Sequence, residues 1–188
     1  MSKDRKERPF EARRLDVRAF AAAAAALQGT LPQADLPRLA ESTLALPGDG
    51  ALPPVAWSAR GEQRPVTGGE PEVWLHLQAE TAVWLQCQRC LQPLHAPLAV
   101  ARWFRFVATE EEAERLDEAS EDDVLVLPRS LDAQELLEDE LILALPLVPR
   151  HDACPQPLPT SVGEEAIEDD APNPFAALAA LKRPPPGG

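Results

Sequence analysis

The sequence contains no long apolar run, and this absence limits the class of protein that it encodes. None of its 188 residues belongs to a continuous apolar stretch of about 18, the length that a membrane-spanning helix needs. Residues 1–8 are mostly charged, and no apolar run leads from them to a cleavage-like site. We therefore expect a soluble protein with neither a membrane span nor a secretory signal.

Cysteine is also scarce. The three cysteines are Cys87, Cys90 and Cys154. Their number is odd and the first two lie only three positions apart, which argues against a framework of disulfide bonds and favours a reducing compartment. The cytoplasm is the location that this pattern predicts.

Recognisable catalytic motifs are absent too. The sequence has no Ser-His-Asp order, no glycine-rich loop that would hold a phosphate, and no His-Glu-x-x-His pattern. His76 and His95 fall within strand and loop patterns, where histidine has ordinary structural roles. A general acid–base pair would require a desolvated carboxylate, which no sequence feature indicates. We expect no enzyme and no small-molecule substrate, and an RNA-processing enzyme is the least favoured hypothesis.

Acidic residues are abundant and unevenly distributed. The net charge is −13, and residues 110–140 hold fourteen Asp and Glu against Arg115 and Arg129. Residues 1–18 hold seven Lys and Arg against four acids. An acidic surface repels a phosphate backbone and attracts basic proteins, so a basic protein is the expected partner. The alternative is that the acidity only keeps the protein soluble.

Alternation of apolar and polar residues between 55 and 107 predicts a β-sheet. Val73, Leu75 and Leu77 share one face of a strand, and Leu98 to Phe106 form a further strand whose alternation only Arg102 breaks. Gly68 and Gly69 mark a turn between strands. The four tryptophans fall in these strands, which favours core or half-buried positions over a surface that stacks on nucleic-acid bases.

Four helices are expected around this sheet. Asp16 is expected to cap a helix that runs through the alanine run 21–26 and ends at Gly29. A second, short helix is expected at 36–42. Thr109 and Asp132 open two further helices with capping boxes. The second of these ends in the apolar run 141–145, which we expect to be buried almost all round. The fold class is therefore α+β, with an antiparallel β-sheet core flanked by a few helices.

The composition also predicts how the chain is divided. We expect, in order, a flexible basic arm (1–14), a single α+β domain (15–150), an acidic and proline-rich linker (151–172), a short C-terminal helix (173–183) and a tail (184–188).

Four residues form a candidate metal site. Cys87 and Cys90 have the spacing with which a tight turn presents two thiolates to one ion, and His151 and Cys154 repeat this spacing. Together they match structural Zn²⁺ chemistry. Two alternatives remain open. In one, Cys87 is a core side chain, Cys90 is an exposed thiol and the other two residues lie in a mobile loop. In the other, the cysteine pair is a redox site.

Five basic residues are candidates for contact with RNA or a partner: Arg89, Arg102, Arg105, Lys182 and Arg183. Arg89 lies within the cysteine turn, which could present it to a phosphate group. A structural salt bridge is the alternative role for this side chain.

Three blocks of the sequence, taken in order, resemble the YceD family of bacterial and plastid proteins, the large ribosomal RNA subunit accumulation proteins. Weaker similarity extends from about residue 9 over nearly the whole chain. The blocks are Leu85-Gln-Cys87-Gln-Arg-Cys90-Leu91, then Glu138-Asp-Glu-Leu-Ile-Leu-Ala-Leu-Pro146-Leu-Val-Pro149, then Asn173-Pro-Phe175-Ala-Ala-Leu-Ala-Ala-Leu-Lys182.

The resemblance implies a ribosome biogenesis factor that supports synthesis, processing or stability of large-subunit ribosomal RNA, without an assigned catalytic activity. The implied partner is a ribosomal protein or the pre-ribosomal large subunit. Many relatives carry a cysteine-rich C-terminal segment that looks zinc-binding. At the matching place this chain has His151 and Cys154.

Overall fold

The computed structural model describes residues 9–45, 52–119 and 123–156. The chain divides into two units, Met1–Ala153 and Cys154–Gly188, and only residues 154–156 of the second unit are described. Most of the predicted linker, the predicted C-terminal helix at 173–183 and the tail therefore lie outside the described residues.

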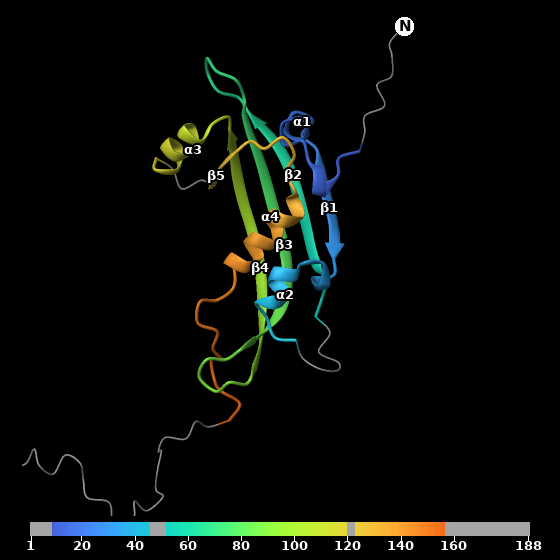
Figure 1. Ribbon diagram of the computed structural model, residues 1–188, viewed down its shortest axis with the longest axis vertical. Helices are drawn as coiled ribbons and strands as arrows, with labels where there is room; N and C mark the ends of the chain where they lie inside the picture. The colour runs from blue at the N-terminus through green and yellow to red at the C-terminus, as the bar shows by residue number, and fades with distance from the viewer. Residues whose placement is uncertain (1–8, 46–51, 120–122, 157–188) are drawn as a thin grey trace, which may run out of the picture. The chain divides into compact units, whose positions relative to one another are not determined.

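A five-stranded sheet is the centre of the first unit (Figure 1). The strands are hydrogen-bonded in chain order, and all neighbours are antiparallel except β4 and β5, which are parallel. The strands are β1 (Ala26–Leu31), β2 (Val55–Arg64), β3 (Glu72–Gln86), β4 (Pro93–Val107) and β5 (Asp123–Val126).

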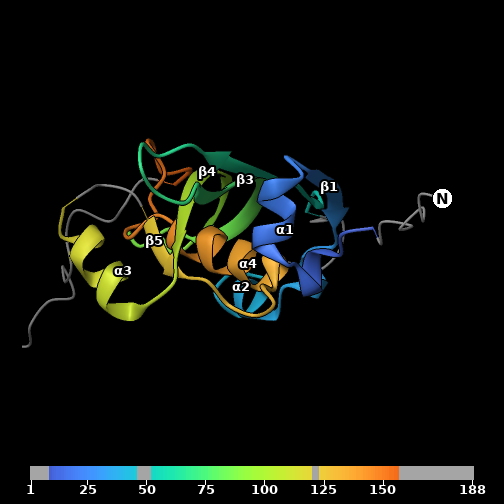
Figure 2. The ribbon, with the colours of Figure 1, turned by 90° about the horizontal axis from the view of Figure 1, so that it is seen from above.

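Helices α1, α2 and α4 gather on one face of the sheet, whereas α3 lies beyond β5 (Figure 2). A parallel pair needs a crossover, and α3 lies in the connection from β4 to β5. The predicted α+β class is confirmed. The helices are α1 (Val17–Ala22), α2 (Pro37–Glu41), α3 (Glu110–Asp117) and α4 (Ala133–Leu143), with 3₁₀ turns η1 (Ala12–Arg14) and η2 (Gln33–Asp35).

The inner face of the sheet, which these helices cover, carries the core. Leu75 and Leu77 of β3 are fully buried, as their alternation predicts. Arg102 breaks the pattern of β4 because it meets a charged residue of α4: its Nε lies 3.5 Å from Oε2 of Glu140. The break in alternation therefore marks an ion pair at the margin of the core.

The prediction for the alanine run is wrong. Helix α1 ends at Ala22, Ala24 adopts a left-handed φ of 46°, and the chain then enters β1, with Gly29 inside that strand. Alanine favours helix by only a few tenths of a kcal/mol per residue over most residues. Pairing of β1 with the edge of β2 along six residue pairs outweighs that preference.

The end of α4 also differs from its prediction. Leu141 is fully buried, but Leu143 is 73% exposed. The sheet lies against one side of the helix, so an apolar run this long cannot be covered all round. The run leaves apolar surface outside the core.

The N-terminal segment begins to pack before the predicted boundary at residue 15. The ring of Phe10 meets that of Phe20 edge to face, with centroids 5.0 Å apart. Arg13 Nε donates to Oε1 of Gln134, 2.6 Å away. Residues 1–8 of the predicted arm lie outside the described part of the chain. No helix among the described residues has the length and apolarity to cross a membrane.

Candidate metal centre

A tight turn joins β3 to β4 and carries Cys87 and Cys90. The N–H of Cys87 donates to the carbonyl of Gln92 over 3.0 Å, and the N–H of Leu91 donates to the carbonyl of Cys87 over 2.8 Å. Leu91 takes a left-handed φ of 61°, which lets the chain reverse within these few residues. The turn brings the two thiols close together, as the Cys-x-x-Cys spacing predicts.

The segment after α4 returns beside this turn (Figure 1). The N–H of Gln88 donates to the carbonyl of Pro149 over 2.9 Å. The guanidinium of Arg89 donates from Nη2 to the carbonyl of His151 over 3.2 Å. These bonds join parts of the chain that are about sixty residues apart, and they place His151 next to Cys90.

Cys87, Cys90, His151 and Cys154 lie close enough to hold a metal ion. One ligand atom of each lies within 4.8 Å of the others, and Cys90 Sγ is 3.5 Å from His151 Nδ1. Tetrahedral zinc with Zn–S bonds of about 2.3 Å separates its ligand atoms by roughly 3.8 Å. The observed spacing fits such an ion after small side-chain adjustments.

The histidine ring is oriented for metal binding by its second nitrogen. His151 Nε2 lies 3.0 Å from the carbonyl oxygen of Pro93. A carbonyl can only accept, so Nε2 carries a hydrogen, and in the neutral ring Nδ1 keeps its lone pair. Nδ1 is the nitrogen that faces Cys90. Metal-ligating histidines commonly use their other nitrogen in this way.

The Cys87 thiol lies in an environment that favours the thiolate. Burial raises its pKa, but backbone N–H groups of His151, Cys90 and Arg89 and the Cys90 side chain outweigh this effect and lower the pKa to about 5. Cys87 is fully buried, as the interpretation of it as a core residue also predicts. Donors around the sulfur are what a metal thiolate needs and what a purely apolar core position would lack.

The three described arginines of the predicted RNA contact do not come together. Arg102 and Arg105 are three positions apart on β4 and lie on opposite faces of the sheet. Arg105 pairs with Glu72 over 2.7 Å, and Arg102 with Asp123 over 3.4 Å. Arg89 lies beyond the start of β4, roughly 30 Å along the strand from Arg102 at about 3.3 Å per residue. Lys182 and Arg183 lie outside the described residues.

The outer face of the sheet groups Arg105 with two other arginines and with aromatic rings, a cluster that sequence reasoning missed. Arg64 lies over Trp74 and Trp103, 3.9 Å and 4.5 Å from their centroids, and His76 stacks on Trp103 at 4.4 Å. Burial and the charge of Arg60 lower the pKa of His76. Cross-strand register supplies this grouping, and the only sequence signal was the alternation of these residues with apolar ones. Because the indole faces already hold partners, the cluster stabilises the sheet.

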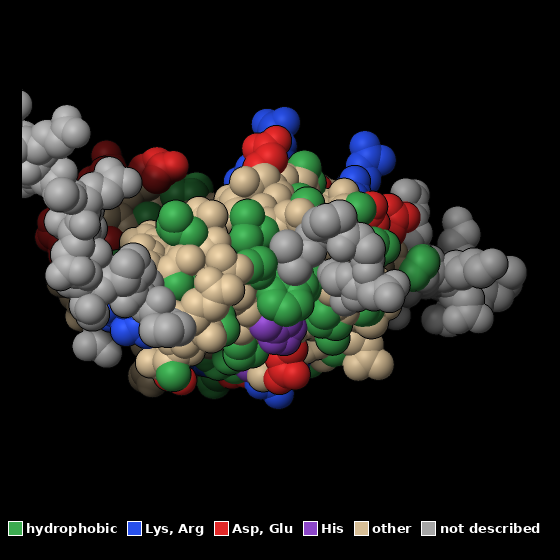
Figure 3. Space-filling model, turned by 90° about the horizontal axis from the view of Figure 1, so that it is seen from below, with side chains coloured by type: hydrophobic (Ala, Val, Ile, Leu, Met, Phe, Trp, Pro, Cys, Tyr) green, Lys and Arg blue, Asp and Glu red, His purple; other side chains and the backbone are tan. Residues whose placement is uncertain are grey.

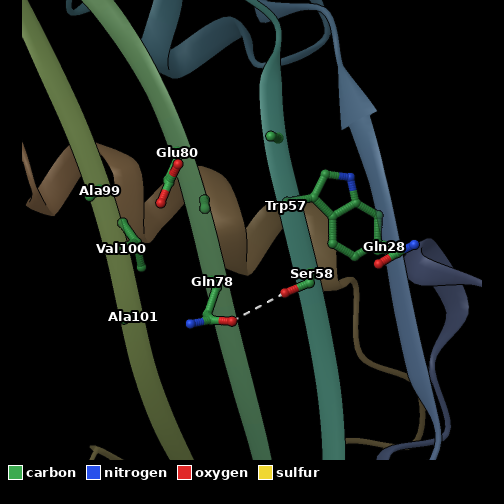
Figure 4. Close-up of a pocket in the computed structure, with 10 residues that line it drawn as sticks. Gln28, Trp57, Ser58, Gln78, Glu80, Ala99, Val100 and Ala101 are labelled. Atoms are coloured by element: carbon green, nitrogen blue, oxygen red, sulfur yellow. Dashed lines mark hydrogen bonds between the residues drawn. The ribbon is translucent and has the colours of Figure 1, made fainter.

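A shallow hollow lies further along the same outer face (Figure 4). Its volume is ≈ 380 Å³, and Ser58 and Gln78 approach each other over 3.5 Å within it. Glu80 is the sole ionisable residue among those that line it. This hollow therefore lacks the paired groups of a general acid–base site.

Two carboxylates, Glu138 and Glu140, are buried among the described residues. Glu138 accepts hydrogen bonds from the backbone N–H groups of Arg38 and Leu39, and Glu140 pairs with Arg102. Both therefore hold structural partners.

Comparisons with known proteins match the part of the chain that contains the candidate metal centre. Residues 75–182, more than half of the chain, match the family described as large ribosomal RNA subunit accumulation protein YceD. A curated protein of that name from Haemophilus influenzae is 39% identical over 103 residues, which cover 53% of this chain and 59% of the relative. The chain thus matches less than two thirds of that protein's length. No solved structure matches the chain. The family match includes the cysteine turn, α4 and the segment that carries His151 and Cys154, and the chain therefore belongs to the YceD family.

Proposed function

We propose that this protein supports the accumulation of large-subunit ribosomal RNA by contact with basic ribosomal proteins, and that it does so in the cytoplasm without catalysing a reaction. The family description supports the first part, because it specifies accumulation and names no reaction. The acidic residues around α3 support the proposed contact with basic ribosomal proteins. Glu110, Glu111 and Glu114 are exposed on this helix, whose first turn is entirely acidic.

Electrostatics gives this contact a physical basis. Proteins that neutralise ribosomal RNA are strongly basic before they meet it, and complementary charge speeds encounter and suppresses wrong partners. A protein that holds such a component soluble, or delivers it, raises the survival of the RNA indirectly. The same acidic surface repels RNA itself, so protein contact is favoured over direct RNA binding.

We further propose that the four clustered ligands hold a structural zinc ion. Zinc would supply a closed tetrahedral link between the turn at 87–92 and the segment at 149–154. His151 and Cys90 are placed to bind it through Nδ1 and Sγ. The backbone N–H groups around Cys87 would stabilise the charge on its thiolate. The role of the metal in this proposal is to hold the end of the sheet together.

The test of the proposed contact is capture of proteins extracted from purified large ribosomal subunits. A variant with Glu110, Glu111 and Glu114 changed to lysine is expected to lose most of this capture and to lower large-subunit RNA relative to small-subunit RNA in cells. A matched control changes Asp35, Glu41 and Glu80, which are also exposed, to lysine. Its net charge is the same, so it separates a local contact from overall charge.

Equal losses in both variants, or no loss in either, would contradict the proposal. Direct RNA contact is the rival mechanism. It predicts that the purified protein, free of ribosomal proteins, crosslinks to pre-ribosomal RNA, and that Arg89→Ala combined with Arg105→Ala reduces the crosslinking.

A further inference from the structure

A groove is lined by residues of α4 on one side and, on the other, by residues of β5 and by Asp117 at the end of α3. Its volume is ≈ 500 Å³, enough for one or two side chains of a bound segment. All the residues that line it belong to the first unit of the chain. It is separate from the metal centre and from the outer face of the sheet.

Apolar side chains form one part of the groove. Leu125, Leu136 and Ile142 pack against the core and also line the groove, so they are only partly buried. Leu143 extends this surface and is 73% exposed. An apolar surface that continues from the core into solvent is typical of a docking site.

Carboxylates form another part. Asp117, Asp123, Asp139 and Glu140 line the groove, together with the single cation Arg38. Arg38 pairs with Asp139, and Arg102, from outside the lining, pairs with Asp123 and Glu140. Four carboxylates against two arginines leave an excess of negative charge.

This charge narrows the choice of occupant. A nucleic acid would place phosphates against four carboxylates, which is unfavourable. A purely apolar segment would desolvate those carboxylates without offering them a partner. A segment that carries Lys or Arg beside an apolar side chain satisfies both parts of the groove.

We propose that this groove binds a basic, amphipathic segment of a partner protein, with an apolar side chain against Leu143 and Ile142 and a cation among Asp117, Asp139 and Glu140. The inference deepens the proposed function, because it rests on a basic protein partner and assigns the contact to one place. The exposed acids of α3 attract the partner, and the groove holds it. Isolated surface ion pairs contribute little binding energy, so the apolar part supplies most of the affinity.

The test uses the full chain and a short, fluorescently labelled peptide in which lysine and leucine alternate, with binding measured by polarisation. Leu143→Ser is expected to weaken binding roughly tenfold, the effect of losing burial of about one leucine side chain. Leu147→Ser is the matched control, because Leu147 is 97% exposed, lies four residues on and does not line the groove. It is expected to change affinity less than about twofold.

A peptide in which serine replaces leucine provides a second control, and it is expected to bind the parent protein and the Leu143→Ser variant alike. If the two leucine variants bind the lysine–leucine peptide equally, charge alone drives binding and the inference is wrong. A shift of the parent protein from dimer to monomer on Leu143→Ser, with unchanged peptide binding, would assign the groove to a second copy of this chain and overturn the inference.

The proposed function can fail separately. Capture of large-subunit proteins that needs the α3 acids but not Leu143 would overturn the groove and leave the proposed function in place. Peptide binding that needs Leu143, together with capture of large-subunit proteins that does not depend on the α3 acids, would overturn the proposed function and leave the groove in place.

Discussion

Glu138 of α4 binds Arg38 of α2 through both the backbone and the side chain. Its carboxylate accepts the backbone N–H of Arg38 over 2.7 Å and the guanidinium Nε over 3.1 Å. It also accepts the N–H of Leu39 over 3.1 Å. Leu36, the N-cap residue of α2, has no side-chain oxygen to offer these amides, so a residue about one hundred positions away caps the helix.

Glu138→Ala is therefore expected to lower the free energy of unfolding by about 2–3 kcal/mol, because it leaves two amides of α2 without an acceptor and removes one of the two carboxylates that pair with Arg38. Urea unfolding monitored by tryptophan fluorescence measures this. Glu114→Ala, an exposed glutamate of α3, is the control and should change the value by less than about 0.5 kcal/mol. Equal effects of the two substitutions would show that the cap has no energetic importance.

Gly61 allows α1 to lie directly on β2. A Cβ at this position would come within 2.7 Å of Phe20 Cδ1 and 2.8 Å of the backbone of Ala21. Gly61→Ala is expected to destabilise the protein by about 1–3 kcal/mol, since the helix must move away from the strand. Gly69→Ala is the control, because its Cβ would meet nothing closer than Val66 at 3.7 Å. A thermal unfolding midpoint that is the same in both variants would refute the close approach.

Glu140 gives stability a pH dependence. Burial raises its pKa, Arg102 lowers it, and Asp123 and Asp139 raise it, with a net increase. The folded state thus binds the proton more tightly than the unfolded state, so this group's contribution to stability is lost as pH rises from the ordinary carboxyl range through the raised pKa. The side chain of Glu140→Gln cannot ionise, so this variant does not lose stability at position 140 as pH rises.

We expect the free energy of unfolding of Glu140→Gln, relative to that of the parent protein, to increase as pH rises from the ordinary carboxyl range towards neutral. Urea titrations at a series of pH values measure the difference between the two proteins. A difference that stays constant, or that falls with increasing pH, would be inconsistent with the raised pKa.

Zinc binding is testable on the purified protein. Metal analysis is expected to find about one zinc per chain, and Cys90→Ser or His151→Ala should each reduce it strongly because three ligands hold the ion less tightly than four. His95→Ala is the control, since His95 is not part of the cluster. Zinc content that is near zero in the parent protein, or unchanged in both ligand variants, would contradict the metal proposal.

Features set by local sequence were the ones that could be predicted. Thr109 accepts from the N–H of Glu112, and Asp132 from those of Gln134 and Glu135, as the capping patterns indicate. Alternation predicted the buried face of β3 because a strand repeats every two residues. The grouping of Cys87, Cys90, His151 and Cys154 was one of three alternatives that ligand type and spacing left open, and the structure brings these ligand atoms within 4.8 Å of one another.

Features set by pairing over long distances could not be predicted. The alanine run favours helix locally, and only the presence of β2 makes residues 26–31 a strand. The grouping of Arg64 with Trp74 and Trp103 depends on the register of three strands. Exposure of Leu143 depends on how far the sheet extends beside α4, which no local pattern encodes.

The position of the four ligands along the chain has a consequence for synthesis. Cys90 and His151 are 61 positions apart, and β4, α3, β5 and α4 all lie between them. A chain still emerging from the ribosome holds only Cys87 and Cys90 of the cluster until the segment after α4 has been made. Complete coordination is then available only after residue 154 has been made. Metal loading, under the zinc proposal, would distinguish chains that extend past Cys154 from chains truncated before His151.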